Sequence, residues 1–123
     1  MSERLTASQI ALLIAYAAGM AAGQLLFKGA ALRFATPGAG AGERILALFT
    51  NVYFLAALAL YAALAILWVW VLSFTPLSRA YPFVALAFAF TPLLGGLVFD
   101  EAMSMRLVFG VLLILGGLFF VIG

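Results

Sequence analysis

The chain has 123 residues, of which 68% are hydrophobic and 8% are charged, with a net charge of +2 and neither cysteine nor histidine. This composition excludes an ordinary soluble domain, a disulfide and thiol chemistry. With four acidic residues and no Cys or His, it also argues against a metal site and a nucleophilic triad. We therefore expect one membrane domain over residues 1–123 that is not an enzyme, uses no cofactor and binds no nucleic acid.

Four segments of the chain contain no charged residue, and they cover residues 5–27, 45–78, 80–99 and 107–123. A bilayer core about 30 Å thick is crossed by roughly 20 apolar residues of helix. Because backbone polar groups find no water in the bilayer, these segments should be helical. The first segment is longer than the apolar region of a signal peptide, so we expect it to be retained as a helix.

In chain order, the sequence predicts a helix over 6–33, a Gly- and Pro-rich flexible loop over 35–42 and a second helix over 46–73. A tight turn over 75–78 leads to a third helix over 79–99, and residues 100–104 connect it to a fourth over 104–123. The predicted fold class is therefore an all-α membrane protein with four transmembrane helices and both termini on one side. The distribution of Lys and Arg places the first and third loops in the cytoplasm by a margin of one or two charges, which leaves dual topology open.

Two polar side chains stand near the end of the first predicted helix. Gln24 lies within an uncharged segment, and Lys28 follows it one turn later. A buried amide needs a partner, so Gln24 either joins two helices or lines a cavity where it binds a phosphate or a sugar. Lys28 either extends to the interface, as such side chains usually do, or binds substrate; for Arg33 we expect the interfacial role.

The start of the third predicted helix carries a second group of candidates. Arg79 can pair with a phosphate through two hydrogen bonds, and that phosphate belongs either to a substrate or to an ordinary lipid headgroup. Tyr81 and Pro82 fit either a substrate site or a plain first helical turn with an interfacial tyrosine. Trp68, late in the second predicted helix, fits either an interfacial anchor or a cavity wall.

Proline and glycine mark further positions. Pro92 cannot donate to the carbonyl of Phe88, so the third helix should bend there, and Gly95 and Gly96 add flexibility. This bend is either a hinge for alternating access or a static kink. Small residues at 19 and 23 predict close helix packing within the protomer. One face of the last helix carries Gly110, Leu113, Ile114 and Gly117. This face forms either a dimer seam or a contact within the protomer.

Three runs of residues resemble the four-helix members of the drug/metabolite transporter superfamily. They are Gly-Gln-Leu-Leu-Phe-Lys at 23–28, Pro-Leu-Ser-Arg-Ala-Tyr-Pro at 76–82, and Phe-Asp-Glu-Ala-Met-Ser at 99–104 followed by the Gly-rich run 110–117. Two branches have this size: small multidrug resistance exporters and EamA-like flippase subunits for aminoarabinose linked to undecaprenyl phosphate. The resemblance implies a small multidrug resistance-like bundle in the bacterial inner membrane.

The resemblance is closer to the flippase branch. In the multidrug exporters a glutamate eight residues before a lysine carries protons, and the matching position here, counted from Lys28, is Met20, which does not titrate. The Gly-Gln pair at 23–24 and Ala-Tyr-Pro at 80–82 look like the flippase subunits. Met20, to which the resemblance points, thus joins the candidates above, and the predicted substrate-binding residues are Met20, Gln24, Lys28, Trp68, Arg79 and Tyr81.

Three functions follow as expectations. The first is a flippase for a lipid-linked sugar or a similar amphipathic polar metabolite, whose lipid tail stays in the bilayer. The second is an exporter of small or cationic solutes, and the third is a membrane accessory subunit that transports nothing. Because related transporters build their pathway between two structural repeats, a second copy or a paralogous small subunit is expected as partner.

Overall fold

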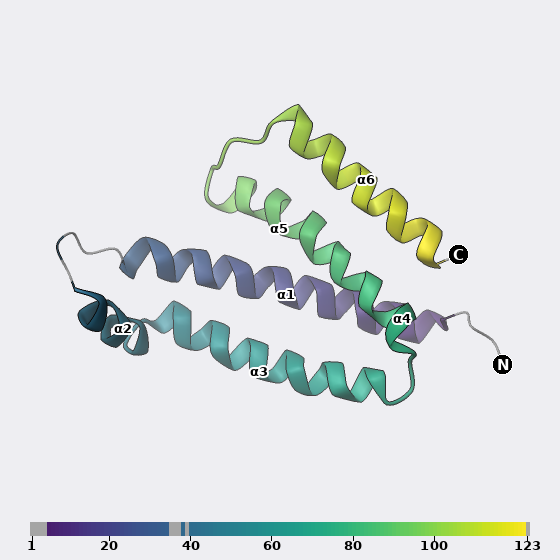
Figure 1. Ribbon diagram of the computed structural model, residues 1–123, viewed down its shortest axis with the longest axis horizontal. Coiled ribbons are helices and arrows are strands. Elements are labelled where there is room, and N and C mark those ends of the chain that lie inside the picture. Colours follow the sequence, from purple (N-terminus) through teal and green to yellow (C-terminus); the bar gives the residue numbers. More distant parts are fainter. Residues whose placement is uncertain (1–4, 35–37, 39, 123) are drawn as a thin grey trace.

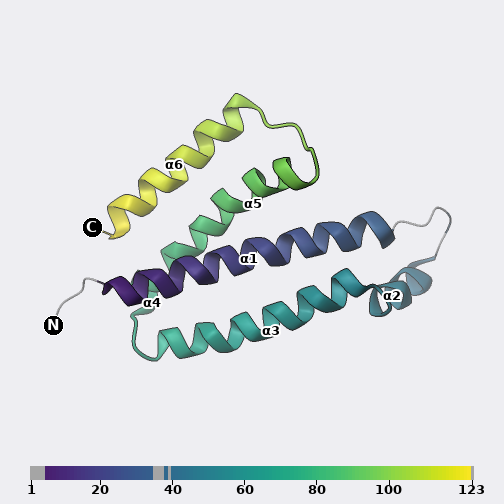
Figure 2. The same ribbon diagram turned by 180° about the vertical axis from the view of Figure 1, so that it is seen from behind.

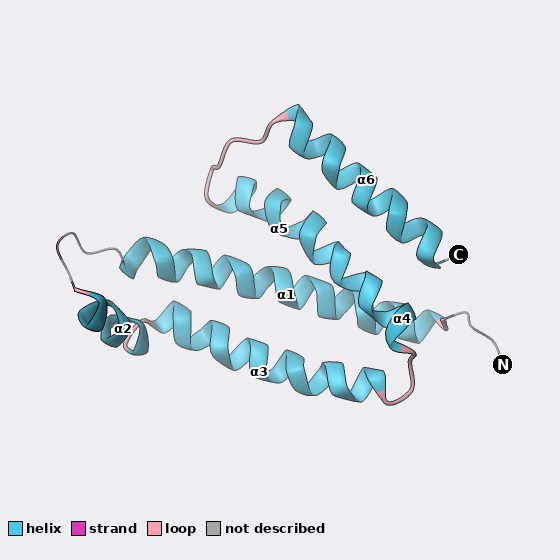
Figure 3. Cartoon of the chain, viewed as in Figure 1, coloured by secondary structure: helices cyan, strands magenta, loops and turns pink. Residues whose placement is uncertain are grey.

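The computed structural model describes residues 5–34, 38 and 40–122, and this part of the chain is helical without any strand (Figures 1 and 3). Four segments are long and apolar enough to cross a membrane, as the sequence predicts: α1, α3, the run Leu77–Val98 and α6. The elements in order are α1 (Ala7–Phe34), α2 (Ala41–Phe49), α3 (Val52–Leu72), α4 (Leu77–Ala80), the 3₁₀ turn η1 (Tyr81–Val84), α5 (Ala85–Val98) and α6 (Met105–Ile122).

Helix α1 is the centre of the arrangement, because α3 and α5 both pack against it. Figures 1 and 2 show α1 and α3 side by side and antiparallel, while α6 lies beyond α5. Helix α1 begins and α6 ends at the same end of the molecule. The main hydrophobic core lies at this end, formed by Leu13, Ala17, Val71, Ala80, Phe83, Leu86 and Leu118. The opposite end of the α1–α5 contact lies outside this core.

The second predicted helix differs from the structure. Instead of one helix over 46–73, the chain forms the short helix α2, which begins at Ala41 inside the predicted loop, and then α3. Residues 35–37 and 39 of that loop are outside the described part. The two helices separate at Asn51, whose side-chain oxygen accepts hydrogen bonds from the backbone N–H groups of Tyr53 (3.0 Å) and Phe54 (3.3 Å). An asparagine at this position favours a new helix start.

Replacing Asn51 by alanine should lower the free energy of unfolding by about 1 kcal/mol, because the N-terminus of α3 loses its cap. The substitution also removes the hydrogen bond from Asn51 Nδ2 to the carbonyl of Ala30 (3.1 Å), which ties α3 to α1. Asn51→Ser keeps a capping oxygen and should lose less stability. Unfolding in mixed detergent micelles, followed by circular dichroism, measures both variants; equal losses would show that the cap contributes nothing.

The third predicted helix, 79–99, is a composite of α4, η1 and α5 spanning Leu77–Val98. Its irregular turn is at Tyr81–Val84, where Pro82 lacks a backbone donor, whereas α5 stays helical through Pro92. The irregular turn thus lies ten residues before Pro92, and the bend at Pro92 stays a prediction. The fourth helix agrees closely with the prediction of 104–123, since α6 covers Met105–Ile122 and residue 123 is outside the described part.

Glycines hold α1 against α3, as the sequence predicts. A Cβ atom on Gly19 would lie 2.8 Å from Leu64 Cδ2, and one on Gly23 would lie 2.5 Å from Tyr61 Cε2. Both distances are below van der Waals contact, so only glycine fits at these positions without a shift of the neighbouring side chain. The small-residue face of α1 therefore packs inside the protomer.

The α6 stripe, which we define as Gly110, Leu113, Ile114 and Gly117, is packed less closely than the glycine face of α1. Val111 and Leu118 are the buried residues of α6, whereas Leu113 is 77% exposed. A Cβ atom on Gly110 or Gly117 would meet nothing within 4 Å in the described chain. Most of the stripe thus contributes little to packing within the protomer, although Ile114 is half-buried. A role as a dimer seam stays a prediction.

Candidate substrate groove between α1 and α5

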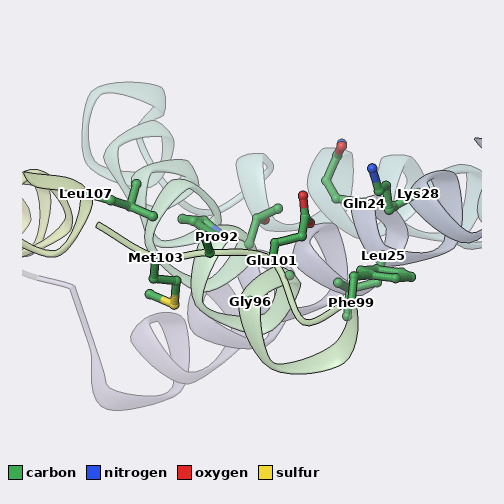
Figure 4. A pocket seen from close by; sticks show the side chains of 12 residues that line it. Gln24, Leu25, Lys28, Pro92, Gly96, Phe99, Glu101, Met103 and Leu107 are labelled. Atoms are coloured by element: carbon green, nitrogen blue, oxygen red, sulfur yellow. The ribbon is translucent and has the colours of Figure 1, made fainter. Parts of the chain in front are cut away.

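Two cavities, of about 310 and 320 Å³, lie between α1 and α5 and share Gln24, Thr91 and Pro92 as lining residues. We call them together the α1–α5 groove. Lys28 and Glu101 line the first cavity, which Figure 4 shows from close by. The groove is thus bounded by two membrane-spanning segments and continues to the loop between α5 and α6.

One face of α1 forms the polar wall of the groove. Met20, Gln24 and Lys28 are spaced four residues apart, a spacing that puts side chains on the same side of a helix. The structure brings all three to the groove: Met20 lines the second cavity, Lys28 lines the first, and Gln24 lines both. These three of the six predicted substrate-binding residues therefore belong to one surface.

The amide of Gln24 is held by Tyr61, which is not among the residues predicted from the sequence. Gln24 Nε2 donates to Tyr61 Oη at 2.8 Å, and Tyr61 Oη donates to the carbonyl oxygen of Met20 at 3.0 Å. The Tyr61 ring also stacks on Phe27, with 5.4 Å between the ring centroids. Tyr61 carries a hydroxyl group in the middle of an otherwise apolar stretch of α3. A polar group at such a position needs a hydrogen-bond partner, and this is the feature of the sequence that points to Tyr61.

The opposite wall comes from α5 and from the loop that follows it. Glu101 Oε1 would lie 3.3 Å from a Cβ atom on Gly95, and Met103 Sδ would lie 2.7 Å from one on Gly96. Because both positions are glycine, the loop side chains approach α5 closely at this end of the groove. Pro92, Gly95 and Gly96, the predicted hinge residues, all line the first cavity. Their motion stays a prediction.

The groove carries both signs of charge. Lys28 and Glu101 line the same cavity, and Figure 4 shows their polar ends on one side of it together with Gln24. In the described part of the chain Lys28 makes neither a hydrogen bond nor an ion pair. Glu101 is an exposed residue of the loop after α5 and lines the first cavity.

The other predicted binding residues lie away from the groove. Trp68 stacks on Tyr16 (4.8 Å between centroids) and meets Tyr81 edge-on (6.4 Å). Tyr16 precedes Gln24 by eight residues, which is about 12 Å along a helix. Trp68 and Tyr81 line a different cavity from Gln24.

Arg79 lies near the end of α6. Its Nη1 donates to the carbonyl oxygen of Val121 at 2.9 Å. A guanidinium near the last carbonyls of a helix interacts favourably with the helix dipole. Arg79 thus links the start of the third membrane segment to the end of the fourth, and binding of a phosphate there stays an expectation outside the groove.

Two further amides in apolar segments are already engaged in structural contacts. Gln9 Nε2 donates to the carbonyl of Phe74 and to Thr75 Oγ1, both at 3.2 Å. Asn51 caps α3 and reaches α1, as described above. Gln24, in contrast, lines both cavities of the α1–α5 groove.

Comparison with protein-family models, with curated proteins and with solved structures finds no match for this chain. The case for a function therefore rests on the groove and on the four membrane-spanning segments.

Proposed function

We propose that the protein is a subunit of a membrane transporter that moves an amphipathic metabolite with an anionic polar headgroup, such as a sugar linked to a polyprenyl phosphate. The observation that carries this proposal is a groove between two apolar membrane segments whose lining includes an amide, Gln24, and an ammonium group, Lys28. Polar groups at membrane depth commonly mark a substrate pathway.

The size of the groove favours a headgroup over a whole lipid. Ligand pockets typically have volumes of about 300–1,000 Å³, and the two cavities, at about 310 and 320 Å³, lie at the lower end of that range. A sugar phosphate fits this space, whereas a polyprenyl chain does not. The lipid tail therefore stays in the bilayer while the headgroup enters between α1 and α5.

The chemistry of the groove suits such a headgroup. Lys28 supplies an ammonium group without a protein partner in the described chain, which can pair with a phosphate through a charge-assisted hydrogen bond. Gln24, one turn deeper, supplies an amide for a sugar, and the Met20, Ala87, Phe88 and Pro92 side chains supply apolar contact. The headgroup thus exchanges water for fixed partners, which lowers the cost of its desolvation.

Four membrane segments form one half of the pathway that related transporter architectures build between two repeats. We therefore propose that a second copy of the chain, or a paralogous small subunit, completes the pathway. The exposed stripe on α6, with Leu113 and the glycines beside it, is a surface available for that contact.

Translocation in proteoliposomes tests the proposal. Vesicles containing undecaprenyl phosphoryl glucose in both leaflets are treated outside with periodate, which oxidises only the exposed sugar. With the protein present, the whole pool should be oxidised; without it, the inner leaflet should stay protected. Equal protection with and without the protein, in vesicles where its insertion is verified, would contradict the proposal.

A second candidate is an exporter of small cationic solutes, and the position of Glu101 in the groove favours it. A carboxylate there supplies an acid that the membrane segments themselves lack. Binding of tetraphenylphosphonium with proton release, abolished by Glu101→Gln, would support this candidate. Translocation of the lipid-linked sugar that continues in Glu101→Gln would support the first.

A further inference from the structure

The hydrogen bonds around Tyr61 fix which end of the Gln24 amide faces this residue. The carbonyl oxygen of Met20 can only accept, so the Tyr61 hydroxyl must donate its single proton there, across 3.0 Å. The Tyr61 oxygen is then left as an acceptor for Gln24, at 2.8 Å. Only the NH₂ group of the amide can donate, and the orientation of Gln24 therefore follows from chemistry.

This orientation leaves the amide oxygen available. Gln24 Nε2 is committed to Tyr61, and no hydrogen bond to Gln24 Oε1 is present in the described residues. Gln24 lines both cavities of the groove. It lies nine residues before Arg33, the end of the first membrane segment, which is about 14 Å along the helix axis. An acceptor at that depth gains most from a ligand that brings a donor.

Tyr61 is itself held firmly, so the amide cannot easily turn. Its ring stacks on Phe27 at an interplanar angle of 16° and lies over Gly23, where a Cβ atom would be 2.5 Å from the ring. If the amide rotated, Gln24 Oε1 would face the Tyr61 oxygen, and the hydroxyl proton would have to leave the Met20 carbonyl to bridge them. One hydrogen bond would then be lost.

We propose that Tyr61 is a positioning residue that fixes the Gln24 amide with its carbonyl oxygen toward the α1–α5 groove, so that Gln24 selects a headgroup bearing a hydrogen-bond donor such as a sugar hydroxyl. The selection rests on the transport function proposed above and adds a specificity-determining contact to it. Lys28, one turn along α1, binds the anionic group of the same ligand. A phosphate whose substituent has no hydroxyl group can still pair with Lys28, but it offers no donor to Gln24.

The orientation can be measured without any ligand. The chain contains two glutamines, Gln9 and Gln24, so ¹⁵N-glutamine labelling gives two side-chain NH₂ signals, which Gln24→Leu assigns. Tyr61→Phe should shift the Gln24 signal and leave the Gln9 signal unchanged. Tyr53→Phe, in the same helix but away from Gln24, serves as the control and should shift neither. An unchanged Gln24 signal in Tyr61→Phe would overturn the positioning role.

The selection is measured with three probes on full-length protein in phosphatidylcholine nanodiscs: farnesyl phosphate, farnesyl phosphoryl glucose and its fully O-methylated derivative. The wild type should bind the glucose probe about tenfold more tightly than the methylated one. This preference should fall toward one in Tyr61→Phe and in Gln24→Leu, and the double variant should lose no more than Gln24→Leu alone. Binding of farnesyl phosphate should change little in Tyr61→Phe.

The outcomes separate this inference from the proposed function. If the wild type binds the glucose and methylated probes equally well, or Tyr61→Phe keeps the full preference, the selection is wrong while transport of anionic lipids stands. If none of the three probes binds to the wild type, the proposed function fails and the selection fails with it, whatever the NMR signal shows about orientation.

Discussion

Replacement of Lys28 by methionine is expected to lower the translocation rate of undecaprenyl phosphoryl glucose at least about tenfold, because a hydrogen bond to a charged group is worth about 1.5–3 kcal/mol. Lys28 lines the groove and has no hydrogen-bond or ion-pair partner in the described chain, so its charge is available to a phosphate. Methionine keeps the length and the apolar stem of the side chain. The measurement is the rate at which periodate oxidises the inner-leaflet sugar in proteoliposomes, once the outer-leaflet sugar has reacted.

Arg33→Met is the matched control for Lys28→Met. Arg33 is a cation on the same helix, but it stacks on Tyr53 at 4.2 Å from the ring centroid and donates to the carbonyl of Gly29 at 3.4 Å. Its removal should leave the rate nearly unchanged, since Arg33 lines neither cavity of the groove. Equal losses in both variants would indicate a general effect of positive charge on insertion or lipid attraction, and would contradict a specific role for Lys28.

Replacement of Gly23 by alanine is expected to lower the free energy of unfolding by about 1–3 kcal/mol, the usual cost of overpacking a close contact. The added Cβ would lie 2.5 Å from Tyr61 Cε2 and 2.9 Å from its Cζ. The ring cannot move away cheaply, because it is stacked on Phe27 and hydrogen-bonded to α1 twice. Thermal unfolding in nanodiscs, monitored by tryptophan fluorescence, measures the loss.

Gly116→Ala provides the control for Gly23→Ala. Gly116 also lies inside a membrane-spanning helix, but a Cβ atom there would meet nothing within 4 Å of the described chain. Alanine at that position should be neutral or slightly stabilising, because glycine is the poorer helix former. A Gly23→Ala variant as stable as Gly116→Ala would show that α1 and α3 are not in tight contact at Tyr61.

The membrane segments could be predicted from the sequence because length and hydropathy determine them almost alone. The same holds for the face of α1 with Met20, Gln24 and Lys28, since helical spacing places these residues together whatever the rest of the chain does. The break at Asn51 was missed because an uncharged segment was interpreted as one helix. The capping side chain that starts α3 there carries no charge.

The partners across the groove could not be predicted in the same way. Tyr61 reaches Gln24 from 37 positions further along the chain, and Glu101 reaches the groove from a loop. Both contacts depend on how the helices cross, which local pattern does not specify. Arg79 was predicted to bind substrate because a guanidinium can pair with a phosphate, whereas the packing of the third membrane segment against α6 places it beside the carbonyl of Val121.

Cysteine protection tests most directly whether the α1–α5 groove holds the headgroup. The chain has no cysteine, so Thr91→Cys places a single thiol in the groove. Ser78→Cys places a single thiol in a different cavity, which Arg79 also lines. Farnesyl phosphoryl glucose should slow the reaction of N-ethylmaleimide with Thr91→Cys and leave that of Ser78→Cys unchanged. Protection of Ser78→Cys alone, or of neither thiol in a protein that still translocates the lipid, would contradict the assignment of the groove.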